Sequence, residues 1–267
     1  MPARSYLFVP ADRPERYAKA LASGADAVIV DLEDAVAASA KDGARASLAA
    51  WLDSGGRGIV VRINDAASRA FDADLGLVSH PGVVGVVVPK AERADDLARV
   101  RAAAPSAALL PLIETAAGID RVREIAAAPG VQRLAFGSID FQLDLGIEEG
   151  SDGSELLAFR SALVLASRLA ALDPPVDGVS TAIDDAGSLE ADTRRARRLG
   201  FGAKLCIHPR QVAAVNAAFA PSAEELAWAE RVVAAAASSA GAAVAVDGRM
   251  VDRPVLLRAQ SILAHKP

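Results

Sequence analysis

Residues Leu109–Thr115 have the sequence LLPLIET, a hydrophobic run that ends in a carboxylate. Apolar positions around a single proline are typical of a buried strand, and Glu114 then follows the strand's C-terminal end. A second run, QRLAFGSID over Gln132–Asp140, repeats the pattern and is expected to place Asp140 at a strand end. With a helix predicted between them, the two runs indicate repeating β–α units.

Glu114 and Asp140 converge on one rim if the two strands belong to a parallel barrel, because the carboxyl ends of all its strands meet on one face. Hard carboxylate oxygens placed in this way suit Mg²⁺, which also binds substrate oxygens. The alternative is that each carboxylate only caps the helix that follows it. Spacing alone supports the two hypotheses about equally.

Short hydrophobic runs alternate with amphipathic segments along most of the chain. The predicted strands are Tyr6–Val9, Ala27–Leu32, Gly58–Ile63, Val83–Val88, Ala108–Ile113, Arg133–Phe136, Val176–Val179 and Phe201–Cys206. The predicted helices are Glu15–Ser23, Lys41–Leu52, Ala67–Val78, Arg93–Ala103, Ala116–Ala127, Glu155–Leu172 and Leu189–Leu199. About eight such units predict an α/β fold, a closed (β/α)8 TIM barrel over residues 1–220. A doubly wound open sheet is the alternative, but it needs a glycine-rich turn after the first strand, where Val9–Asp12 has no glycine.

Residues 221–267 lie outside the barrel repeat and form a predicted C-terminal helical extension. Ser222 is the expected N-cap of a helix over Ala223–Ala237. A short strand over Ala243–Val246, a turn at Asp247 and Gly248, and a final segment over Met250–Leu263 follow. The extension is expected to be a lid, an oligomer arm or simple packing.

Composition excludes several classes of protein. With 267 residues, 52% of them hydrophobic and 24% charged, the chain can bury a substantial core. A formal net charge of −5 argues against a general binder of nucleic acid or anionic membranes. Cys206 is the single cysteine, so an intrachain disulfide is excluded and a reducing compartment is favoured. We therefore expect a soluble cytoplasmic protein and interpret Cys206 as a core residue.

Charged residues follow several other predicted strands. Arg13 and Arg16 come after the first strand, where they form either an anion site or a solvated helical turn; the solvated turn is favoured. Asp31, Glu33 and Asp34 follow the second strand and need a cation, hydrogen-bond donors or water to compensate them. Three roles are equally compatible with them: direct metal ligands, contacts to a metal through water, or pairing with Arg62 and Lys90.

Arg62 ends the third predicted strand and is flanked by apolar residues. It should be partly buried against an anion, either a substrate carboxylate or the acidic cluster formed by Asp31, Glu33 and Asp34. Lys90 follows the fourth strand, where a lysine also permits a Schiff-base aldolase, with Lys204 as a weaker candidate. The hypothesis of a metal site gives a role to more of these residues than the Schiff-base hypothesis does. His208 is either a general base or a structural hydrogen-bonding group.

Eight motifs occur in an order that is specific to one family. They are LFVPADRPER (Leu7–Arg16), VIVDLEDAV (Val28–Val36), VVRIN (Val60–Asn64), VPK (Val88–Lys90), PLIET (Pro111–Thr115), FGSIDF (Phe136–Phe141), CIHPRQV (Cys206–Val212) and GRMVDRPV (Gly248–Val255). Over nearly its whole length the chain resembles the citrate lyase β-subunit-like CoA-ester lyases. These enzymes belong to the aldolase/citrate lyase superfamily of phosphoenolpyruvate-type barrels.

The resemblance implies that Glu114 and Asp140 bind Mg²⁺ and that Arg62, with the metal, grips the keto-acid part of the substrate. It also implies a substrate carrying coenzyme A (CoA), which Arg13 and Arg16 would face. Asp252, in the C-terminal motif, would reach a neighbouring subunit's site in a homotrimer or a dimer of trimers and handle a proton. We therefore assign Asp252, Arg62 and Glu114 to catalysis. The substrate-binding set adds the following residues to Arg62 and Glu114: Arg13, Arg16, Lys90, Asp31 and Glu33.

One position departs from the family pattern. Many members have Glu-Asp where this chain has Ile139 and Asp140, so one carboxylate beside the expected metal ligand is missing. Asp140 is retained, so metal binding is expected to survive. Substrate preference and rate are the properties that this change affects.

The implied reaction is the Mg²⁺-dependent retro-Claisen cleavage of citramalyl-, malyl- or citryl-CoA to acetyl-CoA and a small 2-keto acid. Three alternatives remain open. They are a metal-dependent aldolase for keto acids without CoA, an acyl-CoA thioesterase, and a weakly active acyl-CoA-binding subunit.

Overall fold

The computed structural model describes residues 2–150, 152–238 and 244–266. The chain forms two compact units, Pro2–Asn216 and Ala217–Pro267. Within the described residues, no helix is long and apolar enough to cross a membrane. The lid or oligomer-arm roles expected of residues 221–267 stay predictions.

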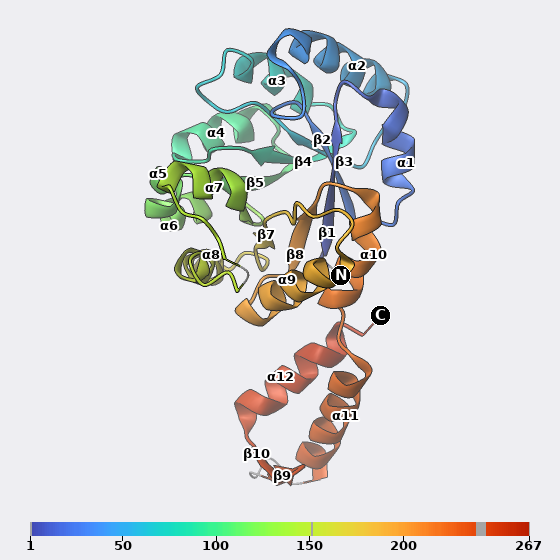
Figure 1. Cartoon of the computed structure of the whole chain (residues 1–267), viewed down its shortest axis with the longest axis vertical. Helices are drawn as coiled ribbons and strands as arrows, with labels where there is room; N and C mark the ends of the chain where they lie inside the picture. Colours follow the sequence, from blue (N-terminus) through green and yellow to red (C-terminus); the bar gives the residue numbers. More distant parts are fainter. Residues whose placement is uncertain (1, 151, 239–243, 267) are drawn as a thin grey trace. The chain divides into compact units, whose positions relative to one another are not determined.

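The first unit is a closed barrel of eight parallel strands in sequence order, which confirms the predicted fold class (Figure 1). The strands are β1 (Ser5–Pro10), β2 (Ala27–Asp31), β3 (Ile59–Arg62), β4 (Val83–Val88), β5 (Ala108–Ile113), β6 (Ala135–Phe136), β7 (Val176–Asp177) and β8 (Ala203–Cys206). Their inward-facing side chains, such as Ile29, Val87 and Leu110, form one buried cluster. Continuous apolar runs suit these strands because both faces of each are covered.

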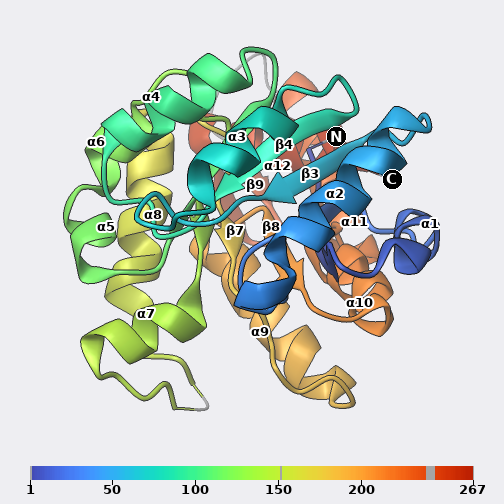
Figure 2. The same cartoon turned by 90° about the horizontal axis from the view of Figure 1, so that it is seen from above.

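Helices surround the strands, as Figure 2 shows. Their bounds are η1 (Pro14–Arg16), α1 (Tyr17–Leu21), η2 (Ala38–Ala40), α2 (Lys41–Asp53), α3 (Phe71–Val78), α4 (Ala94–Ala103), α5 (Ala116–Asp120), α6 (Val122–Ala126), α7 (Ser138–Leu145), α8 (Leu157–Leu169), α9 (Ala186–Leu199) and α10 (Pro209–Phe219). The helix predicted over Ala116–Ala127 is divided at Arg121 into α5 and α6. Elsewhere the predicted helix cores are confirmed and their ends differ by a few residues.

Helix α7 is the main departure from the prediction. The strand predicted over Arg133–Phe136 does end at Phe136, but Asp140 comes four residues later, in the first turn of α7, and not at the strand end. The placement of Asp140 at a strand end was therefore wrong. The helix was not recognised because it is short and only Phe141 of its apolar residues is fully buried, whereas Ile139 and Leu143 are 48% and 81% exposed, so no buried stripe marks it.

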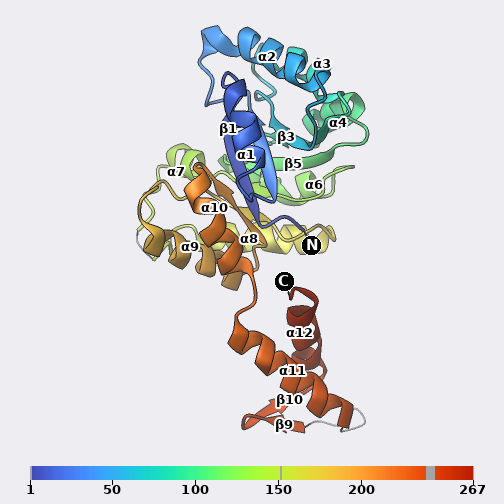
Figure 3. The ribbon, with the colours of Figure 1, turned by 90° about the vertical axis from the view of Figure 1, so that its right-hand side faces the viewer.

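The second unit contains α11 (Ala223–Ser238), β9 (Val244–Val246), β10 (Arg249–Val251) and α12 (Arg253–Ala264). The two helices lie side by side in Figure 3. Ser222 caps α11 as predicted, because its Oγ accepts the Glu225 N–H at 3.1 Å. The final predicted segment divides into β10 and α12, and Ala243 lies outside the described residues.

The turn predicted at Asp247 and Gly248 joins β9 to β10 in an antiparallel hairpin. Both residues have positive φ, 51° and 74°, as a two-residue hairpin turn with the right-handed strand twist requires.

Candidate active site

A cavity of approximately 390 Å³ opens at the carboxyl ends of the barrel strands. Its charged lining residues are Asp31, Asp34, Arg62, Glu114 and Asp140. The position follows from the fold: β2 ends at Asp31, β3 ends at Arg62, and Glu114 comes directly after β5. Asp31 and Arg62 are also register partners on adjacent strands. The barrel therefore brings together four of the residues predicted from strand ends, namely Asp31, Arg62, Glu114 and Asp140.

Glu114 is buried, with 2% of its surface exposed. The backbone N–H of Lys90 donates to Glu114 Oε1 at 2.7 Å. Gly137 leaves room for this carboxylate, since a Cβ there would collide with it. Burial, and then the negative charges of Glu33 and Asp140, raise the pKa of Glu114 to about 8. A carboxylate in this setting lacks a compensating cation, and a bound divalent ion would supply one.

Asp140 is half-buried and makes no hydrogen bond or ion pair with any described residue. It lines the same cavity as Glu114, so the two carboxylates form a donor set of hard oxygens. No group of three or more His, Cys, Asp or Glu side chains suited to a metal occurs among the described residues. Two carboxylates nevertheless fit Mg²⁺, which commonly takes its other ligands from water and substrate.

Arg62 is enclosed by the acidic cluster. Its Nε and Nη2 donate to the two carboxylate oxygens of Asp31 at 2.7 and 2.6 Å. Nη1 lies 2.9 Å from Glu33 Oε2 and 3.6 Å from Asp34 Oδ2. Burial alone would lower the pKa of Arg62, but the hydrogen bonds and charge of Asp31, then Glu33 and Asp34, raise it. The prediction that Arg62 is partly buried against an anion is confirmed, and the anion is the acidic cluster.

Lys90 supports this cluster from outside the cavity lining. Its Nζ donates to Glu33 Oε1 at 2.7 Å, and its φ of 44° is uncommon for a residue with a side chain. Burial would lower the pKa of Lys90, but the hydrogen bond and charge of Glu33 raise it. Lys90 is therefore protonated at neutral pH, whereas a Schiff-base nucleophile needs a lowered pKa. The other candidate, Lys204, is buried against Asp177 at 3.4 Å and Gly178 O at 2.7 Å.

Four further predicted residues lie away from the cavity lining. Arg13 and Arg16 are exposed after β1, so their contact with CoA stays a prediction. Asp252 belongs to the second unit, where its carboxylate caps α12 by accepting the Val255 N–H at 3.2 Å; its role in a neighbouring site also stays a prediction. His208 Nδ1 accepts the Arg210 N–H at 3.2 Å, a local structural contact.

Cys206 is a core residue, as predicted. Its side chain is fully buried. Burial raises the pKa of the thiol to about 12. A neutral, inaccessible thiol has no chemical role in the cavity.

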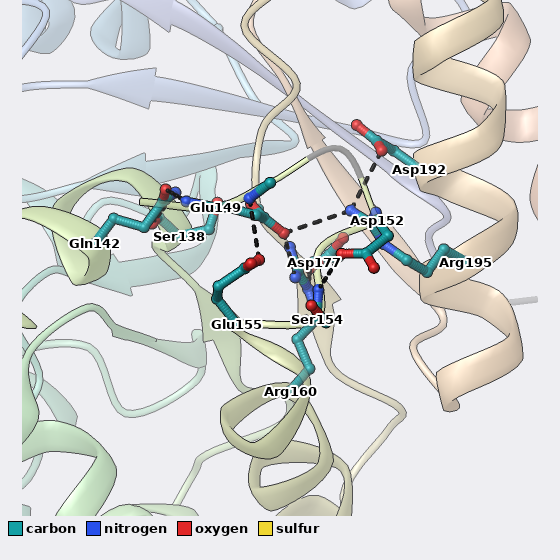
Figure 4. A network of polar contacts seen from close by, with 12 residues as sticks. Ser138, Gln142, Glu149, Asp152, Ser154, Glu155, Arg160, Asp177, Asp192 and Arg195 are labelled. Atoms are coloured by element: carbon teal, nitrogen blue, oxygen red, sulfur yellow. Dashed lines mark hydrogen bonds and ion pairs between the residues drawn. The ribbon is translucent and has the colours of Figure 1, made fainter. Parts of the chain in front are cut away.

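A polar network that the sequence did not reveal holds the segment after α7 (Figure 4). Glu149 Oε1 accepts from Arg160 at 2.6 Å and lies 3.5 Å from Arg195. Arg160 Nε also donates to Asp177 at 3.0 Å, where β7 ends. Gln142 accepts the Glu149 N–H at 2.8 Å and donates to Ser138 O at 2.9 Å, which connects the network to the first turn of α7.

One signal could have located this network. Arg160 stands among apolar residues in the predicted helix, and a buried arginine requires an anionic partner. Neither Glu149 nor Asp177 is identifiable as that partner from the sequence, because both are ordinary acidic residues of loops and strand ends.

Comparison with known proteins identifies the family. Residues 4–209 match the HpcH/HpaI aldolase/citrate lyase family. A citrate lyase subunit beta-like protein of Deinococcus radiodurans is 37% identical over 280 residues, covering 98% of this chain and 97% of the relative. A (3S)-malyl-CoA thioesterase of Cereibacter sphaeroides is 37% identical over 269 residues, covering 98% and 94%.

Among solved structures, CitE of Mycobacterium tuberculosis in complex with magnesium, acetoacetate and coenzyme A aligns with a TM-score of 0.87. It is 39% identical, and the alignment covers 99% of this chain and 98% of CitE. The chain therefore belongs to the HpcH/HpaI aldolase/citrate lyase family, a family of enzymes.

Proposed function

We propose that this protein is a Mg²⁺-dependent CoA-ester lyase that cleaves a 3-hydroxyacyl-CoA to acetyl-CoA and a small 2-oxo acid. The observation that carries the proposal is the convergence of Glu114, Asp140 and Arg62 on one cavity at the barrel rim. Support also comes from the relative CitE, whose structure contains magnesium, acetoacetate and coenzyme A.

Each residue has a defined task in this proposal. Glu114 and Asp140 hold the metal, with the Lys90 N–H fixing the orientation of the Glu114 carboxylate. Arg62, held rigidly by Asp31, orients the carboxylate of the oxo-acid half. When bound, Mg²⁺ supplies positive charge that stabilises the oxygens of the reacting group. Arg13 and Arg16 would contact the CoA phosphates.

The bond change is a reverse Claisen cleavage. The C3 hydroxyl loses its proton and becomes the carbonyl of the oxo acid, while the C2–C3 bond breaks and its electron pair passes to the acetyl carbon. That carbon then takes a proton, which we assign to Asp252 of a neighbouring subunit within a trimer or dimer of trimers.

Thioester hydrolysis is the second candidate, because a relative of 37% identity is a (3S)-malyl-CoA thioesterase. The two reactions differ in their products. Hydrolysis of malyl-CoA releases malate and a free CoA thiol, whereas cleavage releases glyoxylate and acetyl-CoA, whose thiol stays blocked.

The test follows both products from citramalyl-CoA and malyl-CoA, with Mg²⁺ and then with excess EDTA. Acetyl-CoA is resolved by chromatography and free thiol is measured with Ellman's reagent. We expect release of acetyl-CoA, and we expect EDTA to abolish it. Glu114→Gln should lower the rate of release at least about 100-fold, since the metal loses a charged ligand oxygen. Free thiol without acetyl-CoA would establish the thioesterase, and turnover unaffected by EDTA would contradict the metal mechanism.

A further inference from the structure

The cavity has an apolar wall beside the carboxylates. Ile139, next to Asp140 in the first turn of α7, lines the cavity with 48% of its surface exposed. Phe8, Val179, Leu205 and Ile207 also contribute apolar surface. An exposed isoleucine that faces a cavity favours an apolar group of the ligand there, because burying both surfaces removes them from water.

The charges of the cavity lining also favour an apolar group over a second carboxylate. Four lining residues are acidic, namely Asp31, Asp34, Glu114 and Asp140, and Arg62 is the one cation among the described lining residues. Arg62 is already engaged by Asp31 and Glu33. Lys90, near the cavity, is engaged by Glu33 at 2.7 Å.

A divalent metal and Arg62 together can receive one carboxylate of an oxo acid. A second carboxylate would enter a cavity whose uncompensated groups are negative, and no free cation of the described lining could pair with it. Placing an unpaired anion there is strongly unfavourable.

We infer that the 2-oxo acid half of the substrate is a monocarboxylate with a short alkyl group, of the pyruvate and 2-oxobutyrate class. Ile139 is the residue that sets this preference. The inference rests on the proposed function and narrows its substrate. The corresponding thioester carries an alkyl group at C3, as citramalyl-CoA does. Citryl-CoA carries a second free carboxylate at that position instead.

The experiment compares ligands of equal chain length that differ in one carboxylate. Binding of 2-oxobutyrate and freshly prepared oxaloacetate to the Mg²⁺-loaded full chain is measured by calorimetry, with pyruvate and glyoxylate alongside. We expect 2-oxobutyrate to bind at least about tenfold more tightly than oxaloacetate. Pyruvate should bind more tightly than glyoxylate by roughly fourfold, the effect of one buried methyl-sized group.

Substitution of Ile139 tests the residue itself. Its half-exposed position on α7 tolerates polar replacements without loss of a core contact. Ile139→Lys supplies a free cation and should reverse the ratio of the two affinities, so that oxaloacetate binds more tightly than 2-oxobutyrate. Ile139→Met, which is apolar and similar in size, should leave this ratio unchanged. The ratio of kcat/KM for citramalyl-CoA and citryl-CoA should change in the same way.

The outcomes distinguish failure of the proposed substrate selectivity from failure of the proposed lyase function. Equal binding of 2-oxobutyrate and oxaloacetate, or an unchanged ratio in Ile139→Lys, overturns the selectivity and leaves the lyase proposal intact. No binding of any 2-oxo acid to the folded, Mg²⁺-loaded protein overturns the proposed function and this inference with it.

Discussion

At the scale of the single residue, Lys90 has two functions that depend on different parts of it. Its ammonium pairs with Glu33, and its backbone N–H is directed at Glu114 by a left-handed conformation with φ 44°. Such a conformation is strained for any residue with a Cβ, and glycine alone adopts it freely.

The two functions can be separated by comparing Lys90→Gly with Lys90→Ala. Both variants lose the ammonium, but only glycine relieves the backbone strain. We expect Lys90→Gly to be more stable than Lys90→Ala by about 1 kcal/mol in urea unfolding, since the left-handed conformation no longer opposes folding. Equal stability would show that the backbone is not strained at this position.

Cys206 provides a prediction on pH dependence. Burial raises the pKa of its thiol to about 12 in the folded protein, against roughly 8.5 for an exposed cysteine. The folded state therefore retains the thiol proton to a higher pH than the unfolded state does. The thiol's contribution to stability is complete below about pH 8.5 and is lost as the pH rises toward the folded value.

We expect Cys206 to resist Ellman's reagent at pH 8 in the folded chain and to react at once in urea. The stability advantage of the wild type over Cys206→Ala should shrink as the pH rises above 9. Rapid labelling of the folded protein would contradict the buried, neutral thiol.

At the scale of the element, α7 carries both Asp140 and Ile139, and its one fully buried apolar side chain, Phe141, packs edge-on against Phe136 and Phe159. Its own Leu143 is 81% exposed. Polar contacts hold the exposed side of the helix: Gln142 links Ser138 O to the Glu149 backbone, and Glu149 binds the buried Arg160. The position of Asp140, the proposed metal ligand, therefore depends in part on this charged network.

Arg160→Met should lower the free energy of unfolding by about 3 kcal/mol, because it leaves the carboxylates of Glu149 and Asp177 with fewer partners in a buried setting. The matched control is Arg194→Met, whose partner Glu190 is on the same exposed face of α9, and it should change stability by less than about 0.5 kcal/mol. Both values come from urea unfolding. Similar losses in the two variants would contradict the role given to the network.

At the scale of the whole molecule, the unit Ala217–Pro267 carries Asp252, while the cavity belongs to the barrel unit. Asp252 caps α12, so replacing it by alanine would mix a structural effect with a catalytic one. Asn caps a helix as well as Asp does, and Asp252→Asn therefore removes the negative charge while keeping the cap.

We expect Asp252→Asn to lower the lyase rate by orders of magnitude while Mg²⁺ and pyruvate bind with unchanged affinity. Co-expression with Glu114→Gln tests whether Asp252 acts between subunits. Neither variant is active alone, but random mixing should restore about a quarter of the wild-type rate if each site uses a neighbour's aspartate. No recovery in mixed oligomers would contradict the assignment to a neighbouring subunit.

The sequence alone determined the eight-stranded barrel and the rim on which Asp31, Arg62 and Glu114 meet. Hydrophobic periodicity is a local property, and strands Val83–Val88 and Ala108–Ile113 have their predicted bounds for that reason. Once a parallel barrel forms, its geometry brings every strand end to one face.

The sequence proposed pairing with Arg62 and Lys90 as one of several ways to compensate Asp31, Glu33 and Asp34, and only the tertiary structure showed that this pairing occurs. Arg62 pairs with Asp31 at a separation of 31 residues, and Lys90 with Glu33 at 57, so the pairing of strands in the barrel, and not a local pattern, determines these partners. Helix α7 was missed because it is short and only Phe141 among its apolar residues is fully buried, so its local pattern has no amphipathic stripe. Local sequence reports what a segment must bury, whereas the pairing of charges depends on which segments the finished fold brings into contact.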